Sequence, residues 1–327
     1  MNILITGAAG MVGRKLTEEL VRRGEIGGRA LTGLTLIDIV PPIVPDGVPG
    51  AALSVDMADP AAAQALIEQR PDVIFHLAAI VSGEAEADFE KGYGVNLDGT
   101  LALLRAVAAQ PDYCPRFVFT SSIAVFGAPL PDPIPDDHTP EPLTSYGTQK
   151  AMGELMVNDL SRRGLIDGIS LRFPTICIRP GKPNAAASGF FSGILREPLN
   201  GQEAILPVPD DVKHWHASPR AAVAFLIQAA EMDLTPMGPR RALSLPGVAA
   251  TVGEQIAALE RVAGPEAVAL IRREPDETIM RIVEGWPRSF DPARARKLGF
   301  EAEPDMDTII RVYIEDELDG RLPVQQG

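Results

Sequence analysis

The chain has 327 residues, of which 46% are hydrophobic and 23% are charged, and its formal net charge is −14. This composition is typical of a globular protein with a sizeable core. The acidic balance argues against nucleic acid as a partner, because binding phosphates requires clustered basic residues, and no apolar run is long enough to cross a membrane. The two cysteines, Cys114 and Cys177, have no metal-type spacing, so we expect both to be reduced core residues. The sequence begins on an expected strand, so we expect no signal peptide and a cytoplasmic location.

The chain opens with a pattern of strand, glycine-rich turn and helix. Residues 3–5 are apolar, Gly7, Gly10 and Gly13 follow in a GxxGxxG spacing, and residues 15–23 continue with an amphipathic helical pattern. Glycines let backbone N–H groups approach a pyrophosphate, and a helix N-terminus adds partial positive charge. The same spacing also occurs in a plain strand–helix turn. Its place between a strand and a helix favours a phosphate cradle.

A second strand is expected over residues 34–40, with Asp38 at its end. In a dinucleotide-binding fold an acid at this place hydrogen-bonds the ribose hydroxyls of adenosine. It would also repel a 2′-phosphate, and no Arg or Lys lies between Ile39 and Pro49 to offset that repulsion. The pattern therefore favours NAD over NADP, the alternative being a surface Asp that starts a turn.

Strands and helices then alternate along the chain. Strands are expected over residues 51–55, 72–77 and 116–120, and helices from Asp59 or Pro60 to about Arg70 and over residues 96–110. His76 lies among apolar neighbours, and we interpret it as a core histidine rather than a ligand.

Three polar side chains near the middle of the chain suggest acid–base chemistry. Ser122 follows an expected strand, while Tyr146 and Lys150 are one turn apart on an expected helix that runs to about Arg163. A free tyrosine has a pKa of about 10, which is too high for a base at neutral pH. A nearby lysine ammonium favours the phenolate and lowers that pKa. Ser122 could hold the substrate oxygen beside the tyrosine.

The motifs GAAGMVG, HLAA, TSSIAVFG and SYGTQK together resemble the extended short-chain dehydrogenases/reductases, the NAD-dependent epimerase/dehydratase group. The resemblance covers nearly the whole chain. It implies an α/β fold with a Rossmann-type, doubly wound parallel sheet that binds NAD, formed by residues 1–173 and about 217–246. It also implies a smaller, discontinuous substrate domain, formed by about 174–216 and 247–327.

Matched residue by residue, the resemblance implies catalytic roles for Ser122, Tyr146 and Lys150. The cofactor contacts that it implies come from Gly7, Gly10, Met11, Val12, Gly13, Asp38, Asp56, Leu77, Ala79, Asn96, Tyr146, Lys150, Pro174 and Ile176. It also implies a homodimer, in which the helices at 96–110 and 146–163 pack against those of a second copy. Apolar residues beyond a single stripe, such as Met152 and Leu155, agree with this, although one subunit could also cover them by itself.

The end of the next expected strand, residues 170–178, departs from the nucleotide-sugar enzymes of the group. Those enzymes often carry an aromatic–asparagine pair and VYGP here, whereas this chain has FPTICIRPG. The stretch that follows resembles the acid-sugar oxidoreductases of the group that act on D-erythronate. The expected reaction is therefore NAD-dependent oxidation of a secondary alcohol, at the C2 hydroxyl of a small sugar acid. The alternatives are an NAD-dependent epimerase or dehydratase, a uronate-type dehydrogenase, and a catalytically silent NAD-binding regulator, against which the intact Ser–Tyr–Lys set argues.

A small sugar acid needs charge-assisted hydrogen bonds, and Arg179 is the favoured carboxylate ligand. The candidate substrate residues are Ser122, Tyr146, Arg179, Asn184, Ser188 and His214, with Lys182 and Arg220 as further candidates. His214 and His216 would point the same way from a strand, but no third ligand accompanies them, so we expect no metal site.

Overall fold

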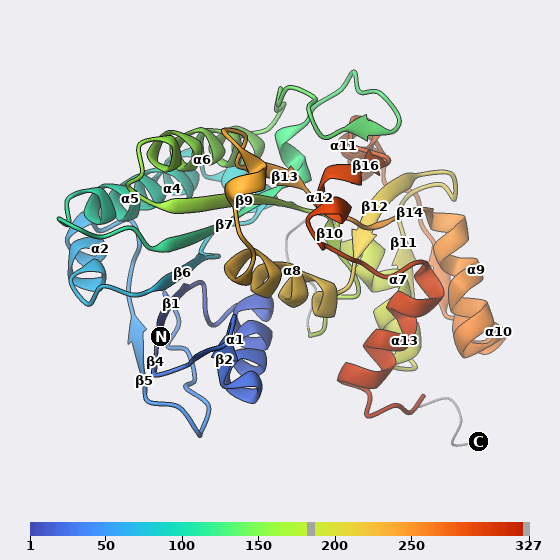
Figure 1. Cartoon of the computed structure of the whole chain (residues 1–327). Coiled ribbons are helices and arrows are strands. Elements are labelled where there is room, and N and C mark those ends of the chain that lie inside the picture. The colour runs from blue at the N-terminus through green and yellow to red at the C-terminus, as the bar shows by residue number, and fades with distance from the viewer. Residues whose placement is uncertain (182–186, 323–327) are drawn as a thin grey trace.

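The computed structural model describes residues 1–181 and 187–322. Its largest element is a seven-stranded sheet in which all neighbouring strands are parallel (Figure 1). The strands across the sheet are β13 (Ala242–Ser244), β9 (Asp167–Phe173), β7 (Arg116–Ser122), β6 (Val73–His76), β1 (Asn2–Thr6), β4 (Gly33–Asp38) and β5 (Gly50–Ser54). The chain runs outward from β1 in both directions, which is the doubly wound Rossmann-type arrangement expected.

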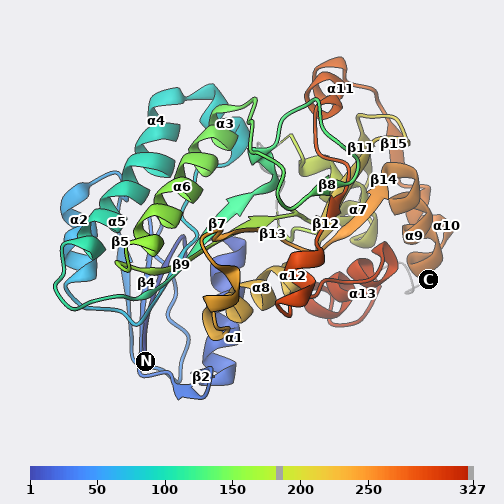
Figure 2. The same ribbon diagram turned by 45° about the horizontal axis from the view of Figure 1, so that its top comes forward.

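Helices cover both faces of this sheet (Figures 1 and 2). One face carries α1 (Met11–Arg23) and α8 (Pro219–Glu231), and the other carries α2 (Pro60–Ile67), α5 (Thr100–Ala108) and α6 (Ser145–Arg162). Side chains of a strand alternate between its faces. Accordingly, Ile3 and Ile5 of β1 pack with α1 and α8, whereas Leu4 packs with α2 and α5. None of the helices in the described residues is long and apolar enough to span a bilayer.

A second core lies beside the sheet, on the side of the molecule where the chain ends (Figure 1). It contains a three-stranded sheet in the order β10 (Thr175–Ile176), β12 (Lys213–Ala217) and β14 (Val248–Thr251), and a pair of strands, β11 (Ala204–Leu206) and β15 (Ile271–Arg273). The helices α7 (Gly189–Leu199), α9 (Val252–Ala263) and α13 (Met306–Glu317) contribute most of its apolar side chains. A capping box between Thr251 and Glu254 fixes the start of α9.

Shorter elements connect these parts. They are β2 (Glu25–Ile26), β3 (Arg29–Ala30), α3 (Ser82–Ala87), α4 (Phe89–Tyr93), the π-helix η1 (Gly94–Gly99), the 3₁₀-helices η2 (Ile123–Val125) and η3 (Thr235–Met237), β8 (Ile134–Pro135), α10 (Pro265–Val268), α11 (Glu277–Glu284), β16 (Phe290–Asp291) and α12 (Ala293–Lys297). The pairing of β8 with β16 ties the loop after β7 to the C-terminal part of the chain.

The structure differs from the sequence-based expectation at several element boundaries. The strand expected over 170–178 is divided at Pro174, so that β9 ends in the main sheet and β10 joins the three-stranded sheet. Proline lacks the N–H that a ladder needs, which accounts for the break. The helix expected from residue 96 begins as η1 and becomes α-helical only at Thr100. The wider turn shifts the helix face, so Leu103 is buried in place of Leu97 and Leu101, which are half-buried.

The expectation for the cysteines is half correct. Both are free thiols, and Cys177 is fully buried, but Cys114 is exposed. Cys114 lies in the connection between α5 and β7, and such connections run over the protein surface.

Candidate functional site

The predicted site residues converge on one edge of the main sheet. Because the strands are parallel, their carboxyl ends all reach this edge, where open α/β sheets bind ligands. The glycine turn follows β1, Asp38 ends β4, Ser122 ends β7 and Pro174 follows β9.

The glycine turn has the shape of a phosphate cradle. Gly7 has a φ of +74°, and a Cβ there would lie 2.7 Å from the Ala78 nitrogen. A Cβ on Gly13 would overlap the Gly7 carbonyl oxygen, so α1 packs closely on the turn. Gly10 is exposed and sits at the N-cap of α1, where no side chain caps the helix. The N-terminus of α1, which begins with Met11 and Val12, is therefore open to an anionic group such as the pyrophosphate of NAD.

Two carboxylates lie where the adenosine half of NAD is expected. Asp38 accepts hydrogen bonds from the backbone nitrogens of Ala9 (3.0 Å) and Val40 (3.4 Å), which holds its carboxylate next to the glycine turn. Asp56 accepts a bond from the Ala58 nitrogen at 2.9 Å in the turn after β5. The glycine cradle, the open helix end and Asp38 thus fit NAD.

The loop after β6 is held from beneath by Asn96. The Asn96 side chain is 1% exposed, accepts a bond from the Ile80 nitrogen at 2.8 Å and donates to the Ile80 carbonyl oxygen and to Gln149. Leu77 and Ala79 precede Ile80 on the same loop, and Ala79 is exposed. The Asn96 side chain therefore holds the loop by bonds to the loop backbone.

His76 lies in the core beneath this edge, as the sequence predicts. It is 1% exposed, and burial lowers its pKa to about 3. Its ring nitrogens hydrogen-bond the hydroxyls of Thr6 (2.7 Å) and Thr100 (2.8 Å). The neutral ring connects β1, β6 and α5.

Tyr146, Lys150 and Ser122 come together at the start of α6. Thr144 caps this helix through the Gly147 nitrogen at 3.1 Å. The Lys150 Nζ lies 5.7 Å from the centre of the Tyr146 ring and donates to the Thr120 carbonyl oxygen at 2.8 Å. Thr120 and Ser122 belong to the same strand, so Lys150 fixes α6 against the end of β7.

The surroundings of Tyr146 have opposing effects on its pKa. Burial raises the pKa of Tyr146, whereas the neighbouring Ser122 hydroxyl and the positive charge of Arg179 lower it. Burial also lowers the pKa of Lys150 to about 7, and the Glu154 carboxylate opposes that change.

A buried ion pair beneath Lys150 was not predicted from the sequence. Glu154 and Arg172 are each 5% exposed and form a bidentate pair, with Nε–Oε1 at 2.9 Å and Nη2–Oε2 at 2.8 Å. The Ser121 hydroxyl donates to the same carboxylate at 2.6 Å. The available signal was the spacing of Glu154, four residues after Lys150, which continues the helix face that begins at Tyr146.

The predicted substrate residues are in different situations. Arg179 is half-buried, its Nε donates to the Ile176 carbonyl oxygen at 3.1 Å, and its charge acts on Tyr146. Ser188 is half-buried at the N-cap of α7. Arg220 is instead in ion pairs with Glu315 and Asp316. Lys182 and Asn184 lie outside the described residues.

His214 lies on β12, and both of its ring nitrogens form hydrogen bonds within the protein. Its Nε2 is 2.7 Å from the Thr175 hydroxyl and its Nδ1 is 2.8 Å from the Pro287 carbonyl oxygen. The His214 and His216 rings are 5.5 Å apart and tilted by 78°. In residues 1–181 and 187–322, no three His, Cys, Asp or Glu side chains are grouped to hold a metal ion.

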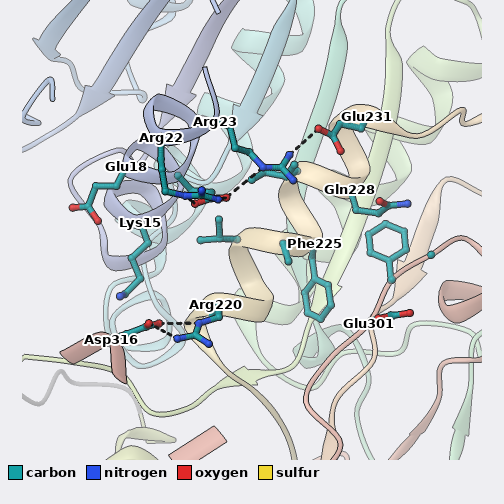
Figure 3. Close-up of a pocket in the computed structure, with 16 residues that line it drawn as sticks. Lys15, Glu18, Arg22, Arg23, Arg220, Phe225, Gln228, Glu231, Glu301 and Asp316 are labelled. Carbon is teal, nitrogen blue, oxygen red and sulfur yellow. Dashed lines mark hydrogen bonds and ion pairs between the residues drawn. The ribbon is translucent and has the colours of Figure 1, made fainter. Parts of the chain in front are cut away.

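A separate groove lies along α1 and α8 (Figure 3), and Tyr146 is not among the residues that line it. Its charged side chains are largely neutralised by one another, as in the pairs Arg23–Glu231 and Arg220–Asp316. Such paired groups leave little net charge to recognise a ligand, and none of the predicted catalytic residues lines this groove.

The chain is similar to several known proteins. Residues 3–216 match the sequence profile of the NAD dependent epimerase/dehydratase family. The D-erythronate dehydrogenase of Cupriavidus necator is 45% identical over 97% of this chain and 98% of its own length. That of Haemophilus influenzae is 40% identical over 97% of this chain and 100% of its own length.

Solved structures give the same fold. One described as a nucleoside-diphosphate-sugar epimerase from Agrobacterium tumefaciens has a TM-score of 0.96 at 62% identity, over 98% of this chain and 95% of its own. An L-threonine dehydrogenase from Cupriavidus necator, in its holo form, has a TM-score of 0.83 at 23% identity, over 97% of this chain and 99% of its own, and so shares the fold.

The low pKa of Lys150 predicts a pH dependence of stability. In the unfolded chain the lysine keeps its proton up to about pH 10, whereas the folded protein releases it as the pH rises through about 7. The unfolded state then binds more protons, so the free energy of unfolding should rise by on the order of 1–2 kcal/mol between pH 7 and 9. Denaturant titrations without cofactor should show this rise in the wild type but not in Lys150→Met. Lys297→Met, which removes an exposed lysine, should keep it. Parallel pH profiles for the wild type and Lys150→Met would contradict the prediction.

Proposed function

Since this chain belongs to the NAD dependent epimerase/dehydratase family, we propose that it is a dehydrogenase that oxidises the C2 hydroxyl of a small sugar acid such as D-erythronate. The observation that carries the proposal is the meeting of Ser122, Tyr146 and Lys150 beside an NAD cradle, with Arg179 close enough to influence Tyr146. The similarity to two D-erythronate dehydrogenases over nearly the whole chain supports the choice of substrate.

Each residue of the set has a distinct part in this reaction. Ser122 holds the substrate hydroxyl by a hydrogen bond, and Tyr146 takes the hydroxyl proton on its phenolate oxygen. Lys150 in its protonated form supplies positive charge that favours the phenolate. Bound NAD would supply the hydride acceptor: the carbon that carries the hydroxyl would lose a hydride while Tyr146 takes the hydroxyl proton, and the alcohol would become a ketone.

We assign the cofactor contacts to the carboxyl edge of the sheet. The turn at residues 7–13 would hold the pyrophosphate and Asp38 the adenosine ribose. Pro174 and Ile176 would lie on the nicotinamide side. This assignment makes residues 1–173 and about 217–246 the NAD-binding domain, and about 174–216 and 247–327 the substrate domain. Two observations support that division. β13, from the returning segment, belongs to the main sheet, whereas α7 and α13, from the two parts of the proposed substrate domain, share the second core.

Arg179 is proposed as the ligand of the substrate carboxylate. It lies close enough to act on the pKa of Tyr146, and a guanidinium group can bind a carboxylate through two parallel hydrogen bonds. Burial lowers its pKa, and a bound anion would compensate for this loss of hydration.

A second candidate function is epimerisation with tightly held NAD. It is favoured by the 62% identity to a structure described as a nucleoside-diphosphate-sugar epimerase. An epimerase reduces and reoxidises its cofactor within one turnover and forms no net NADH. Measuring NADH formation with D-erythronate and with UDP-sugars therefore separates the two candidates, and turnover of UDP-sugars alone would favour the second.

We also propose a homodimer formed through α5 and α6. These two helices lie side by side on one face of the sheet (Figure 2). Leu155 of α6 is 70% exposed and Met152 is 39% exposed, which leaves apolar area that a second copy can cover.

The role of Tyr146 is tested by Tyr146→Phe, which removes the oxygen and keeps the ring. We expect kcat with D-erythronate to fall by roughly 10²–10⁴, the usual contribution of a positioned acid–base group. NAD affinity, measured by calorimetry, should change little. Near-normal turnover of this variant would exclude Tyr146 as the base.

The role of Arg179 is tested by Arg179→Lys, which keeps the charge but loses the planar pair of donors. The KM for D-erythronate should rise about 10-fold or more, as expected for one lost hydrogen bond to a charged group, while the KM for NAD stays nearly constant. Arg220→Lys is the matched control and should change neither constant, because Arg220 pairs with Glu315 and Asp316. Equal KM values for Arg179→Lys and the wild type would refute the assignment.

The dimer is tested by light scattering at micromolar protein concentration. Leu155→Glu places a charge in the proposed interface and should convert the dimer to a monomer. Ile205→Glu changes a comparably exposed apolar residue on β11 and should leave the dimer intact. A wild-type protein that is monomeric under these conditions would rule the proposal out.

A further inference from the structure

Thr175 is a polar residue next to the candidate substrate site that the sequence analysis did not single out. It follows Pro174 directly, at the point where the chain leaves the main sheet, and its side chain is half-buried. The carbonyl oxygen of the next residue, Ile176, accepts the hydrogen bond of Arg179. β10 therefore borders the proposed carboxylate ligand.

The partner of Thr175 determines which way its hydroxyl proton points. The Nδ1 of His214 is 2.8 Å from the Pro287 carbonyl oxygen, and a carbonyl oxygen can only accept. Nδ1 must therefore carry the proton, which leaves Nε2 of the neutral ring as an acceptor. Nε2 is 2.7 Å from the Thr175 oxygen, so the threonine hydroxyl must donate to it.

The histidine ring is held firmly in this state. It stacks on Phe191, with ring centres 5.1 Å apart and planes 7° from parallel, and Trp286 packs at 5.2 Å. His214 is 3% exposed, and burial lowers its pKa to about 4, so the ring is neutral at neutral pH. The doubly protonated ring, which would reverse the Thr175 hydroxyl, is therefore not populated.

We propose that Thr175 determines substrate specificity by accepting a hydrogen bond from a hydroxyl of the sugar acid, and that His214 is the positioning residue that fixes this polarity. This inference rests on the proposed function. A threonine hydroxyl has one proton and two lone pairs, and His214 occupies the proton. The remaining lone pairs attract a hydroxyl donor and repel carboxylate oxygens. The site then orients the substrate, with its carboxylate at Arg179 and a hydroxyl at Thr175.

The contact can be tested with substrates that lack one hydroxyl. D-Erythronate, 2,3-dihydroxybutanoate and 2,4-dihydroxybutanoate would each be assayed with the wild type and with Thr175→Val. We expect Thr175→Val to lower kcat/KM for D-erythronate about 3- to 10-fold, the contribution of one neutral hydrogen bond. With one of the two deoxy compounds, the wild type and the variant should be equal, because the hydroxyl that Thr175 contacts is already missing. Thr175→Ser, which keeps the hydroxyl, should prefer D-erythronate over that deoxy compound as the wild type does.

His214→Asn tests the positioning role. It should lower kcat/KM for D-erythronate but not for the same deoxy compound. The double variant His214→Asn with Thr175→Val should have the same kcat/KM for D-erythronate as Thr175→Val alone. The KM for NAD should stay constant throughout. Thr35→Val, which removes a hydroxyl on β4 that donates to Gln69, is the matched control and should leave all rates unchanged.

The outcomes separate this inference from the proposed function. No NADH from D-erythronate with the wild type would overturn the proposed function and this inference with it. The wild type could instead turn over D-erythronate while Thr175→Val loses the same fraction of kcat/KM on all three compounds. That result would overturn only the assignment of Thr175. Nitrogen NMR of histidine-labelled protein gives an independent readout for variants that fold poorly. A proton on Nε2 of His214, instead of Nδ1, would also overturn the inference.

Discussion

The site depends on keeping a buried lysine next to a tyrosine. Lys150 is 2% exposed, and its charge is stabilised by the Thr120 carbonyl oxygen and by the Glu154 carboxylate. Removing a carboxylate from water is costly unless its oxygens are fully hydrogen-bonded. Arg172 and Ser121 provide those bonds to Glu154. The resulting network joins α6 to β7 and β9, so the helix that carries Tyr146 cannot slide along the strand that carries Ser122.

One residue connects this network to the cofactor side of the sheet edge. The Thr120 carbonyl oxygen accepts from Lys150, while its hydroxyl donates to the His76 carbonyl oxygen at 3.0 Å. The His76 ring in turn bonds Thr6, whose hydroxyl oxygen also accepts from the Ala78 nitrogen at 3.1 Å. The glycine turn, which follows Thr6, and the helix that carries Tyr146 are thus connected through one buried hydrogen-bonded structure. Because every member has a partner, such a network can fix geometry without leaving an uncompensated polar group.

The parts of the fold that the sequence predicts are those that depend on local spacing. The glycine turn, the Tyr146–Lys150 pair and most helices follow from repeats of a few residues. The Glu154–Arg172 and Thr175–His214 pairs join residues 18 and 39 positions apart, and their meeting depends on strand register and packing. The same limit explains the exposed Cys114, since its position carries no local signal for its environment. Pro174 is a local signal for a break, but the sheet that β10 joins after it depends on packing. His214 is a clear case: its residue type suggested a ligand, but only the structure places Thr175 in front of it.

Under the proposed function, the two cations near Tyr146 cannot serve the same purpose. Arg179 lowers the pKa of Tyr146 by its charge. A substrate carboxylate bound to Arg179 would neutralise that charge and so weaken its effect on the tyrosine. Lys150 has no such competitor. Its amino group is directed to the Thr120 carbonyl oxygen, and Glu154, the carboxylate that acts on its pKa, is already paired with Arg172. The chain carries a net charge of −14, so its overall field also opposes an anionic substrate and makes a local cation necessary. An anionic substrate therefore requires two cations. Arg179 binds its carboxylate, and Lys150, which the carboxylate does not neutralise, acts on Tyr146.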